Sequence, residues 1–199
     1  GGSALYQPPE ASLLNSVTAK SDLYSLGMVL IEIVNGRFQY EDLDGSQIRD
    51  RLQNGQRSLP DSKLQPGPWV PRALATFIRS LVAKDPAARP KDAATALRTL
   101  RNIRILDWAR TSGSGRTGTW VGYWPPENVR SEQRIYEITT EPVHSGKRLG
   151  KLNAKVRWRR PNGAWRNVSR LTCYIEETDP ALRTVFRSVE QLAQNSPAP

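Results

Sequence analysis

Few residues in this sequence have the chemistry of a metal site or a covalent nucleophile. The 199 residues contain one cysteine, Cys173, and one histidine, His144. A single thiol excludes an internal disulfide, and a single imidazole excludes a zinc site built from several histidines. We therefore predict no metal ligands, a buried Cys173 and a surface His144. The lone cysteine fits a reducing compartment, so we expect a cytoplasmic location.

One glycine pattern suggests a phosphate loop but lacks the context for it. The run Gly113-Ser114-Gly115-Arg116-Thr117-Gly118 matches Gly-x-Gly-x-x-Gly. In a phosphate-binding protein such glycines are followed by a helix, or by a strand that carries a lysine for the phosphates. Neither follows Gly118. We therefore interpret residues 109–118 as a flexible Gly/Ser linker.

The positive charge of the chain is concentrated in its second half. Residues 1–100 hold 12 basic and 10 acidic residues, whereas residues 101–199 hold 17 and 9. Between Pro142 and Ile175 there are nine basic residues and neither Asp nor Glu. Such a segment favours an anionic partner, because clustered Lys and Arg attract negative charge.

Four of these cations alternate with apolar residues along one predicted strand, and therefore share a face. These candidate anion-binding residues are Lys151, Lys155, Arg157 and Arg159. The face can bind phosphates, and Trp165 or Tyr174 can stack bases beside it, as in proteins that bind single-stranded nucleic acid. The alternatives are an acidic protein partner, docking within the chain, and simple solvation. We favour a protein partner or intramolecular docking over nucleic acid.

Helical periodicity dominates the first hundred residues. The predicted helices cover residues 21–34, 45–54, 71–83 and 90–106. In the first of them Ser21 is the expected N-cap and Gly36 the expected left-handed C-cap. The helix is apolar on nearly every side, so we expect it to be buried all round. Its apolar run contains Glu32 and is shorter than the ~20 residues of a membrane span, so we expect no such span.

The periodicity changes from 3.6 to 2 in the second half. Predicted strands cover residues 119–124, 133–139, 151–159 and 171–175, and a helix covers residues 179–194. We expect an α+β chain with four parts. They are a helical domain (1–108), the linker (109–118), a small antiparallel β-rich domain of barrel or sandwich type with a C-terminal helix (119–194), and a disordered tail (195–199).

Three motifs follow one another in the helical part. They are Gly2-Ser3-Ala4-Leu5-Tyr6-Gln7-Pro8-Pro9-Glu10, Ser21-Asp22-Leu23-Tyr24-Ser25-Leu26-Gly27 and Asp85-Pro86-Ala87-Ala88-Arg89-Pro90. In this order they resemble Gly-Thr-x-x-Tyr-x-Ala-Pro-Glu, Ser-Asp-x-Trp-Ser-x-Gly and Asp-Pro-x-x-Arg-Pro of eukaryotic-like, bacterial-type Ser/Thr protein kinases. The resemblance covers residues 1–101 and implies the helical C-terminal lobe of a kinase, from the end of the activation segment onward. Residues 102–199 carry no motif of a family.

The resemblance also implies a role for each motif residue. The structural residues of the motifs are Pro9, Glu10, Asp22, Gly27 and Arg89, and the residues of the substrate-docking loop are Ser3 and Tyr6. Glu10 and Arg89 would form a buried ion pair. Asp22 would accept hydrogen bonds from the catalytic loop; its alternative role is that of an acid at a helix N-terminus. Tyr6 would line the docking loop or pack against the lobe.

The residues that perform phosphoryl transfer in this family are not found in the sequence. These are a glycine-rich loop, a lysine, the Asp and Asn of the catalytic loop, and an Asp-Phe-Gly motif, all of which precede the activation segment. We therefore expect a fragment with no catalytic residue of its own, which needs the missing N-terminal kinase half as a partner. The whole protein would use ATP and magnesium to phosphorylate Ser or Thr of protein substrates, and this chain alone would bind neither. The alternatives are a non-catalytic scaffold and a module that binds nucleic acid or another anionic partner.

Overall fold

The computed structural model describes residues 4–14, 17–124 and 133–195, and the chain divides into two compact units. The first unit comprises residues 1–67 and 73–103, and the second comprises residues 68–72 and 104–199. The boundary therefore falls at residue 104 rather than after residue 108. The short segment 68–72 comes from the first half of the sequence but belongs to the second unit.

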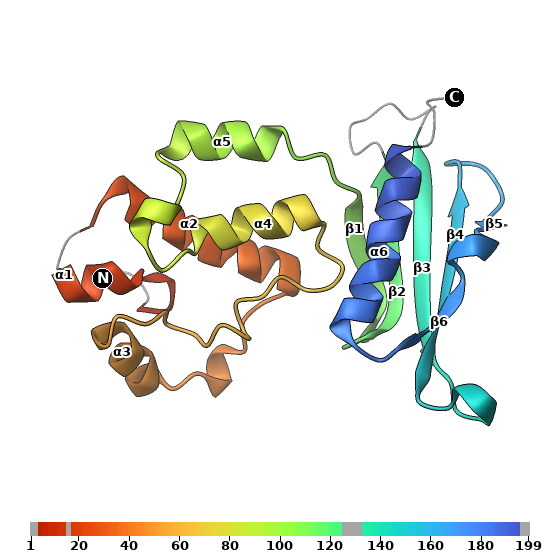
Figure 1. Ribbon diagram of the computed structural model, residues 1–199, viewed down its shortest axis with the longest axis horizontal. Coiled ribbons are helices and arrows are strands. Elements are labelled where there is room, and N and C mark those ends of the chain that lie inside the picture. Colours follow the sequence, from red (N-terminus) through yellow and green to blue (C-terminus); the bar gives the residue numbers. More distant parts are fainter. Residues whose placement is uncertain (1–3, 15–16, 125–132, 196–199) are drawn as a thin grey trace. The chain divides into compact units, whose positions relative to one another are not determined.

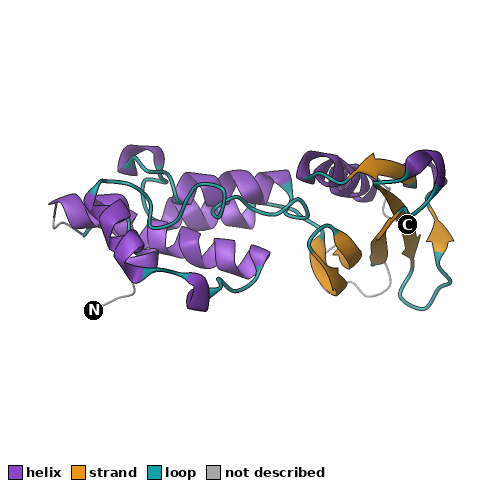
Figure 2. Ribbon diagram, turned by 90° about the horizontal axis from the view of Figure 1, so that it is seen from below, coloured by secondary structure: helices purple, strands orange, loops and turns teal. Residues whose placement is uncertain are grey.

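Helices make up the described part of the first unit (Figure 1; Figure 2, purple). They are α1 (Pro9–Leu14), α2 (Ala19–Asn35), α3 (Gly45–Gln53), α4 (Arg72–Leu81) and α5 (Ala93–Arg101), with the short 3-10 helices η1 (Ala4–Tyr6), η2 (Tyr40–Asp42) and η3 (Pro86–Ala88). Helices α2 to α5 correspond to the four predicted ones. Helix α5 is shorter than expected: it begins after Asp92, whose side chain caps it by accepting a hydrogen bond from Thr95 N at 2.7 Å, and it ends at the C-cap Asn102.

Helix α2 provides the centre of the first unit but is not buried all round. Its side chains Tyr24, Met28 and Ile31 are fully buried in the core. The expectation of burial on every side was wrong, because Val29 and Ile33 are 42% and 69% exposed. The N-cap is Thr18 rather than Ser21, which instead completes a capping box three residues later.

Gly27 allows α2 to pack closely against the end of α4. A Cβ atom at this position would lie 2.7 Å from Val82 Cγ1 and 2.8 Å from Leu81 Cβ. Both neighbours are buried, so neither side chain can move into solvent. The glycine of the second motif is therefore required by packing.

We expect Gly27→Ala to lower the free energy of unfolding of the first unit by about 2 kcal/mol. Overpacking costs ~1–3 kcal/mol, and the two contacts below 3.0 Å place Gly27→Ala at the upper end of this range, from which the better helix propensity of alanine subtracts ~1 kcal/mol. Urea unfolding followed by far-UV circular dichroism measures the difference. Gly45→Ala is the matched control, because the only contact its Cβ would meet is the end of the Arg49 side chain at 3.5 Å. Equal stability of the two variants would contradict the packing argument.

The second unit is an open antiparallel sheet with one helix on it (Figure 1). Its strands are β1 (Asp107–Ser114), β2 (Thr117–Trp124), β3 (Arg134–Pro142), β4 (Lys151–Arg159), β5 (Arg166–Asn167) and β6 (Cys173–Glu176), its long helix is α6 (Asp179–Gln194), and η4 (Gly146–Arg148) and η5 (Ser169–Leu171) are short 3-10 helices. The order is β1-β2-β3-β4-β5, and β6 also pairs with β4. The predicted barrel or sandwich is thus wrong, because β1 does not pair with β5 or β6.

Residues 109–118 form a hairpin instead of the predicted linker. They belong to β1, β2 and the turn between them, and Gly113 pairs with Gly118. Both glycines have positive φ values, and a Cβ atom at either would meet backbone atoms of the other strand within 2.5 Å. The glycines therefore reflect the geometry of a tight turn rather than flexibility.

Helix α6 covers one face of the sheet and closes the core. Apolar residues of α6, among them Phe186 and Val189, pack against Trp120, Ile138 and Val156 of the central strands. The prediction of a C-terminal helix over residues 179–194 is confirmed in its bounds. Cys173, predicted to be buried, is exposed. Of the predicted tail, Asn195 is the C-cap of α6, and residues 196–199 lie outside the described residues.

Candidate functional site

The ion pair expected between the first and third motifs is present. Arg89 donates to both carboxylate oxygens of Glu10, from Nη1 at 2.6 Å and from Nη2 at 2.8 Å. The Arg89 side chain is fully buried and that of Glu10 is 13% exposed. This bidentate ion pair joins residues 79 positions apart in the sequence and so links α1 to the segment after η3.

Arg89 also uses its remaining donors on the backbone. Its guanidinium donates to the carbonyl oxygens of Lys20, Ala83 and Lys84. It lies over the ring of Tyr24, 4.9 Å from the centroid, where the family motif has tryptophan. Aromatic character is what this contact requires, so tyrosine preserves it.

The carboxylate of Glu10 is held in its charged form. Burial alone would raise its pKa, but the hydrogen bonds from Arg89 and the positive charge of that residue lower the pKa below its ordinary value. Ser21 Oγ adds a hydrogen bond to Glu10 at 3.2 Å, which lowers the pKa further. The pair is therefore charged on both sides at neutral pH.

Tyr6 is anchored to the helical core of the first unit. Its hydroxyl donates to Glu32 and lies 2.6 Å from the hydroxyl of Tyr40, which also donates to Glu32. The hydrogen bonds from Tyr40 and Tyr6 lower the pKa of Glu32, and burial together with the neighbouring carboxylate raises the pKa of Tyr6. No role was predicted for Glu32 or Tyr40, although a lone acid within an apolar helix was the signal for such a site.

The segment that contains Tyr6 is fixed at its backbone as well. Ser58 Oγ donates to Leu5 O and Ser25 Oγ donates to Tyr6 O at 3.0 Å. The 3-10 helix η1 is thus tied to the core by backbone and side-chain contacts together. Ser3, the other predicted residue of the docking loop, lies outside the described residues.

Asp22 lies at one end of an exposed face of α2. It is exposed in the first turn of the helix, and Leu26, Val29 and Ile33 follow it along the same side. Spacings of four, three and four residues bring these positions onto one face. Pro9 is the first residue of α1, a position that proline favours because its missing N–H has no partner in a helix.

The four candidate anion-binding residues are largely neutralised within the sheet. Lys151 pairs with Glu176 and Lys155 with Glu141, each at 2.8 Å. Arg157 pairs with Glu137, which raises the pKa of the guanidinium through their hydrogen bond. The acids come from β3 and β6, outside the acid-free stretch of sequence.

Among residues 4–14, 17–124 and 133–195, no three His, Cys, Asp or Glu side chains are grouped so that they could hold a metal ion. In the same described residues, no helix has the length and apolar character needed to cross a bilayer.

The sequence matches known kinases. Residues 3–97 match the family model described as protein tyrosine and serine/threonine kinase. Serine/threonine-protein kinase PrkC of Bacillus subtilis is 37% identical over 89 residues, which are 44% of this chain and 13% of PrkC. The probable serine/threonine-protein kinase PknB of Lactococcus lactis is 29% identical over 106 residues, 53% of this chain and 16% of PknB. Histidine protein kinase 1 of Candida albicans is 27% identical over 147 residues, 73% of this chain and 6% of that protein.

The chain thus spans a small part of the length of each of these relatives. The family match ends at residue 97, within α5, and apart from segment 68–72 it lies in the first unit. Within the match lie the Glu10–Arg89 pair and the close packing at Gly27. Residues 3–97 therefore match the protein kinase family, and the bacterial relatives that resemble this chain are named serine/threonine-protein kinases.

Proposed function

We propose that the first unit is the substrate-docking and structural part of a Ser/Thr protein kinase. The whole protein would transfer the γ-phosphoryl group of ATP, with magnesium, to Ser or Thr of protein substrates. The groups that hold ATP and perform the transfer are assigned to the remainder of the kinase domain, which is the principal partner of this chain. The segment around Tyr6 would receive the substrate, and a cytoplasmic location would supply the ATP.

The exposed face of α2 is the observation that carries this proposal. Leu26, Val29 and Ile33 are 43%, 42% and 69% exposed, and Asp22 lies on the same side. A row of aliphatic side chains on an otherwise buried helix marks a surface that another element covers. An acid at the end of that row is suited to accept hydrogen bonds from the backbone of the covering element. We assign this role to the catalytic loop and its neighbouring helix.

Two changes on this face test the proposal. In residues 1–199 alone, Asp22→Ala and Val29→Asp are expected to change the free energy of unfolding by about 1 kcal/mol or less, since both positions are exposed. In the full-length protein, each is expected to lower protein-kinase activity by about 100-fold, because a displaced catalytic loop misaligns the reacting groups. Unfolding in urea and transfer of labelled phosphate to a protein substrate measure the two effects.

Thr76→Asp is the matched control, because it introduces the same side chain at an exposed position of α4. It should leave both stability and activity unchanged. Full activity of Val29→Asp would show that nothing in the kinase covers this face. A full-length protein without kinase activity, in which Asp22→Ala changes nothing, would instead favour the non-catalytic scaffold.

A further inference from the structure

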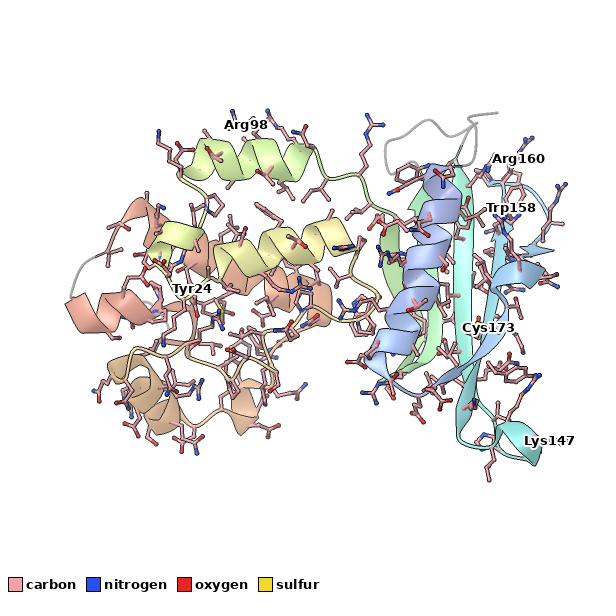
Figure 3. The ribbon with its side chains drawn as sticks, in the orientation of Figure 1. Tyr24, Arg98, Lys147, Trp158, Arg160 and Cys173 are labelled. Atoms are coloured by element: carbon pink, nitrogen blue, oxygen red, sulfur yellow. The ribbon has the colours of Figure 1, made fainter. Side chains whose placement is uncertain are left out.

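Basic and aromatic residues are concentrated at the end of β4 and in the loop after it. Arg157 and Arg159 lie on one face of the sheet with Trp165, whereas Trp158 and Arg166, which pair across β4 and β5, lie on the face that packs against the core. Six residues between positions 157 and 166, here called the arginine–tryptophan cluster, are Arg157, Trp158, Arg159, Arg160, Trp165 and Arg166. Figure 3 shows Trp158 and Arg160 at the same end of the unit, whereas Lys147 lies at the opposite end. The cluster is therefore confined to one end of the unit and is not part of an evenly distributed positive charge.

Guanidinium groups lie over the faces of both tryptophans. The ring of Trp165 has Arg157 Cζ at 4.6 Å and Arg159 Cζ at 4.9 Å from its centroid. Arg166 Cζ lies 5.5 Å from the centroid of Trp158. Both indoles are half-buried, but Trp158 packs against the core, so Trp165 is the indole available to a ligand on the face of Arg157 and Arg159.

The cluster keeps more positive charge than the rest of β4. Lys151 and Lys155 are each paired with a glutamate. Among the described ion pairs, the cluster takes part in one, between Arg157 and Glu137. Arg160 and Arg166 are exposed. The electrostatic potential at this end of the sheet therefore favours an anion. By contrast, the charges of Lys151, Lys155 and Arg157, which the sequence suggested as anion-binding residues, are largely compensated by glutamates.

We propose that the arginine–tryptophan cluster binds single-stranded nucleic acid. Trp165 offers a ring face on which a base stacks, and the arginines offer planar guanidinium groups that donate paired hydrogen bonds to phosphate oxygens. Arg159 is poised for such an exchange, because its Nε–H is buried without a hydrogen-bond partner. When Arg159 moves from Trp165 to a phosphate, it gains a partner and frees the indole for a base.

The combination of groups selects nucleic acid over an acidic peptide. A row of carboxylates needs cations, and lysines serve it as well as arginines, but it makes no use of exposed indole faces. Here all four cations are arginines, and Trp165 lies beside Arg157 and Arg159. A single strand likewise presents a base beside each phosphate. The double helix hides the faces of its bases, so a single strand fits better.

The test measures binding by the whole chain, residues 1–199, to a fluorescein-labelled oligothymidine of about 15 nucleotides, within the ~4–16 nucleotides of known single-strand sites. Fluorescence anisotropy at about 50 mM salt gives the affinity, and a salt series gives its slope. Arg160→Ser/Arg166→Ser is expected to weaken binding at least tenfold and to reduce the salt slope by about 1.4, or about 0.7 per phosphate contact. Trp165→Ala is expected to weaken binding about fivefold or more with little change in the slope.

Arg98→Ser/Lys147→Ser is the matched control, since it removes the same charge from exposed positions outside the cluster. It should change the affinity less than threefold. Three results would overturn the proposal: no binding at low salt, equal weakening in the control and in Arg160→Ser/Arg166→Ser, or competition by polyglutamate as strong as that by unlabelled oligothymidine. The last result would assign the cluster to an acidic protein.

Discussion

Replacing Arg89 by methionine is expected to lower the free energy of unfolding of the first unit by about 3–5 kcal/mol. Methionine keeps most of the volume but removes every donor that Arg89 uses on Glu10 and on three backbone carbonyls. The Glu10 carboxylate then stays in a site where its side chain is 13% exposed and has lost its counter-charge. Removing one member of a buried pair costs more than the pair itself contributes.

The two units can be followed separately in this experiment. All six tryptophans of the chain fall in residues 68–72 and 104–199, so tryptophan fluorescence reports the second unit. Far-UV circular dichroism is dominated by the helices of the first unit. Arg89→Met should shift the urea transition seen by circular dichroism and leave the fluorescence transition in place. A shift of less than about 1 kcal/mol would mean that the pair is as weak as one on the surface.

The pair also makes stability depend on pH, with a defined sign. The folded-state pKa of Glu10 is lowered, so its contribution is present above the pKa of an unfolded glutamate and is lost as the pH falls through the folded value. Glu10→Gln, which keeps the shape of the side chain, should remove this part of the acid sensitivity. It also leaves Arg89 buried without an anion and should therefore destabilise the unit at neutral pH.

Local signals in the sequence were sufficient for most helices and strands. The bounds of α6 and β4 were predicted because their periodicity continues from cap to cap and from turn to turn. The β1–β2 hairpin was missed because β1 is exposed everywhere except at Trp108 and shows no alternation. Composition alone did not distinguish its tight glycine turn from a linker.

The candidate site was predictable only where motifs carried long-range information. The Glu10–Arg89 contact joins distant positions, and nothing local in the sequence requires it; the order of the three motifs suggested it. The basic row on β4 shows the opposite case. Its acids lie on neighbouring strands, and the register that brings Glu137 beside Arg157 is a property of the folded sheet. A window along one strand could not show this compensation.

Trp69 was not singled out because it lies in a Pro- and Gly-rich loop of the first half of the sequence. The structure assigns residues 68–72 to the second unit, where Trp69 packs against the core. Its ring stacks on that of Trp120, with 6.3 Å between the centroids, and Arg110 Cζ lies 5.4 Å from its centroid. The second unit is therefore built from two separate segments of the chain.

Trp69→Ala is accordingly expected to lower the free energy of unfolding of the second unit by about 3 kcal/mol, near the lower limit for loss of a core tryptophan because the side chain is only half-buried. The remaining five tryptophans still report the transition by fluorescence. Trp165→Ala is the matched control: it makes the same truncation on a half-buried ring outside this core, and should cost less than half as much.

The same reasoning predicts that residues 104–199, expressed without the preceding chain, are less stable than the second unit in the whole protein. They lack Trp69, so Trp120 loses its stacking partner and Arg110 loses one of its two aromatic contacts. Urea unfolding of the excised segment should show a lower midpoint, and a peptide that contains residues 66–73 should raise it if the two parts can associate.

An unchanged midpoint in the excised segment, together with a small effect of Trp69→Ala, would mean that the 68–72 segment contacts the sheet without stabilising it. A lowered midpoint would mean that the kinase part and the β-sheet unit cannot be separated at residue 104 without removing a piece of the second core.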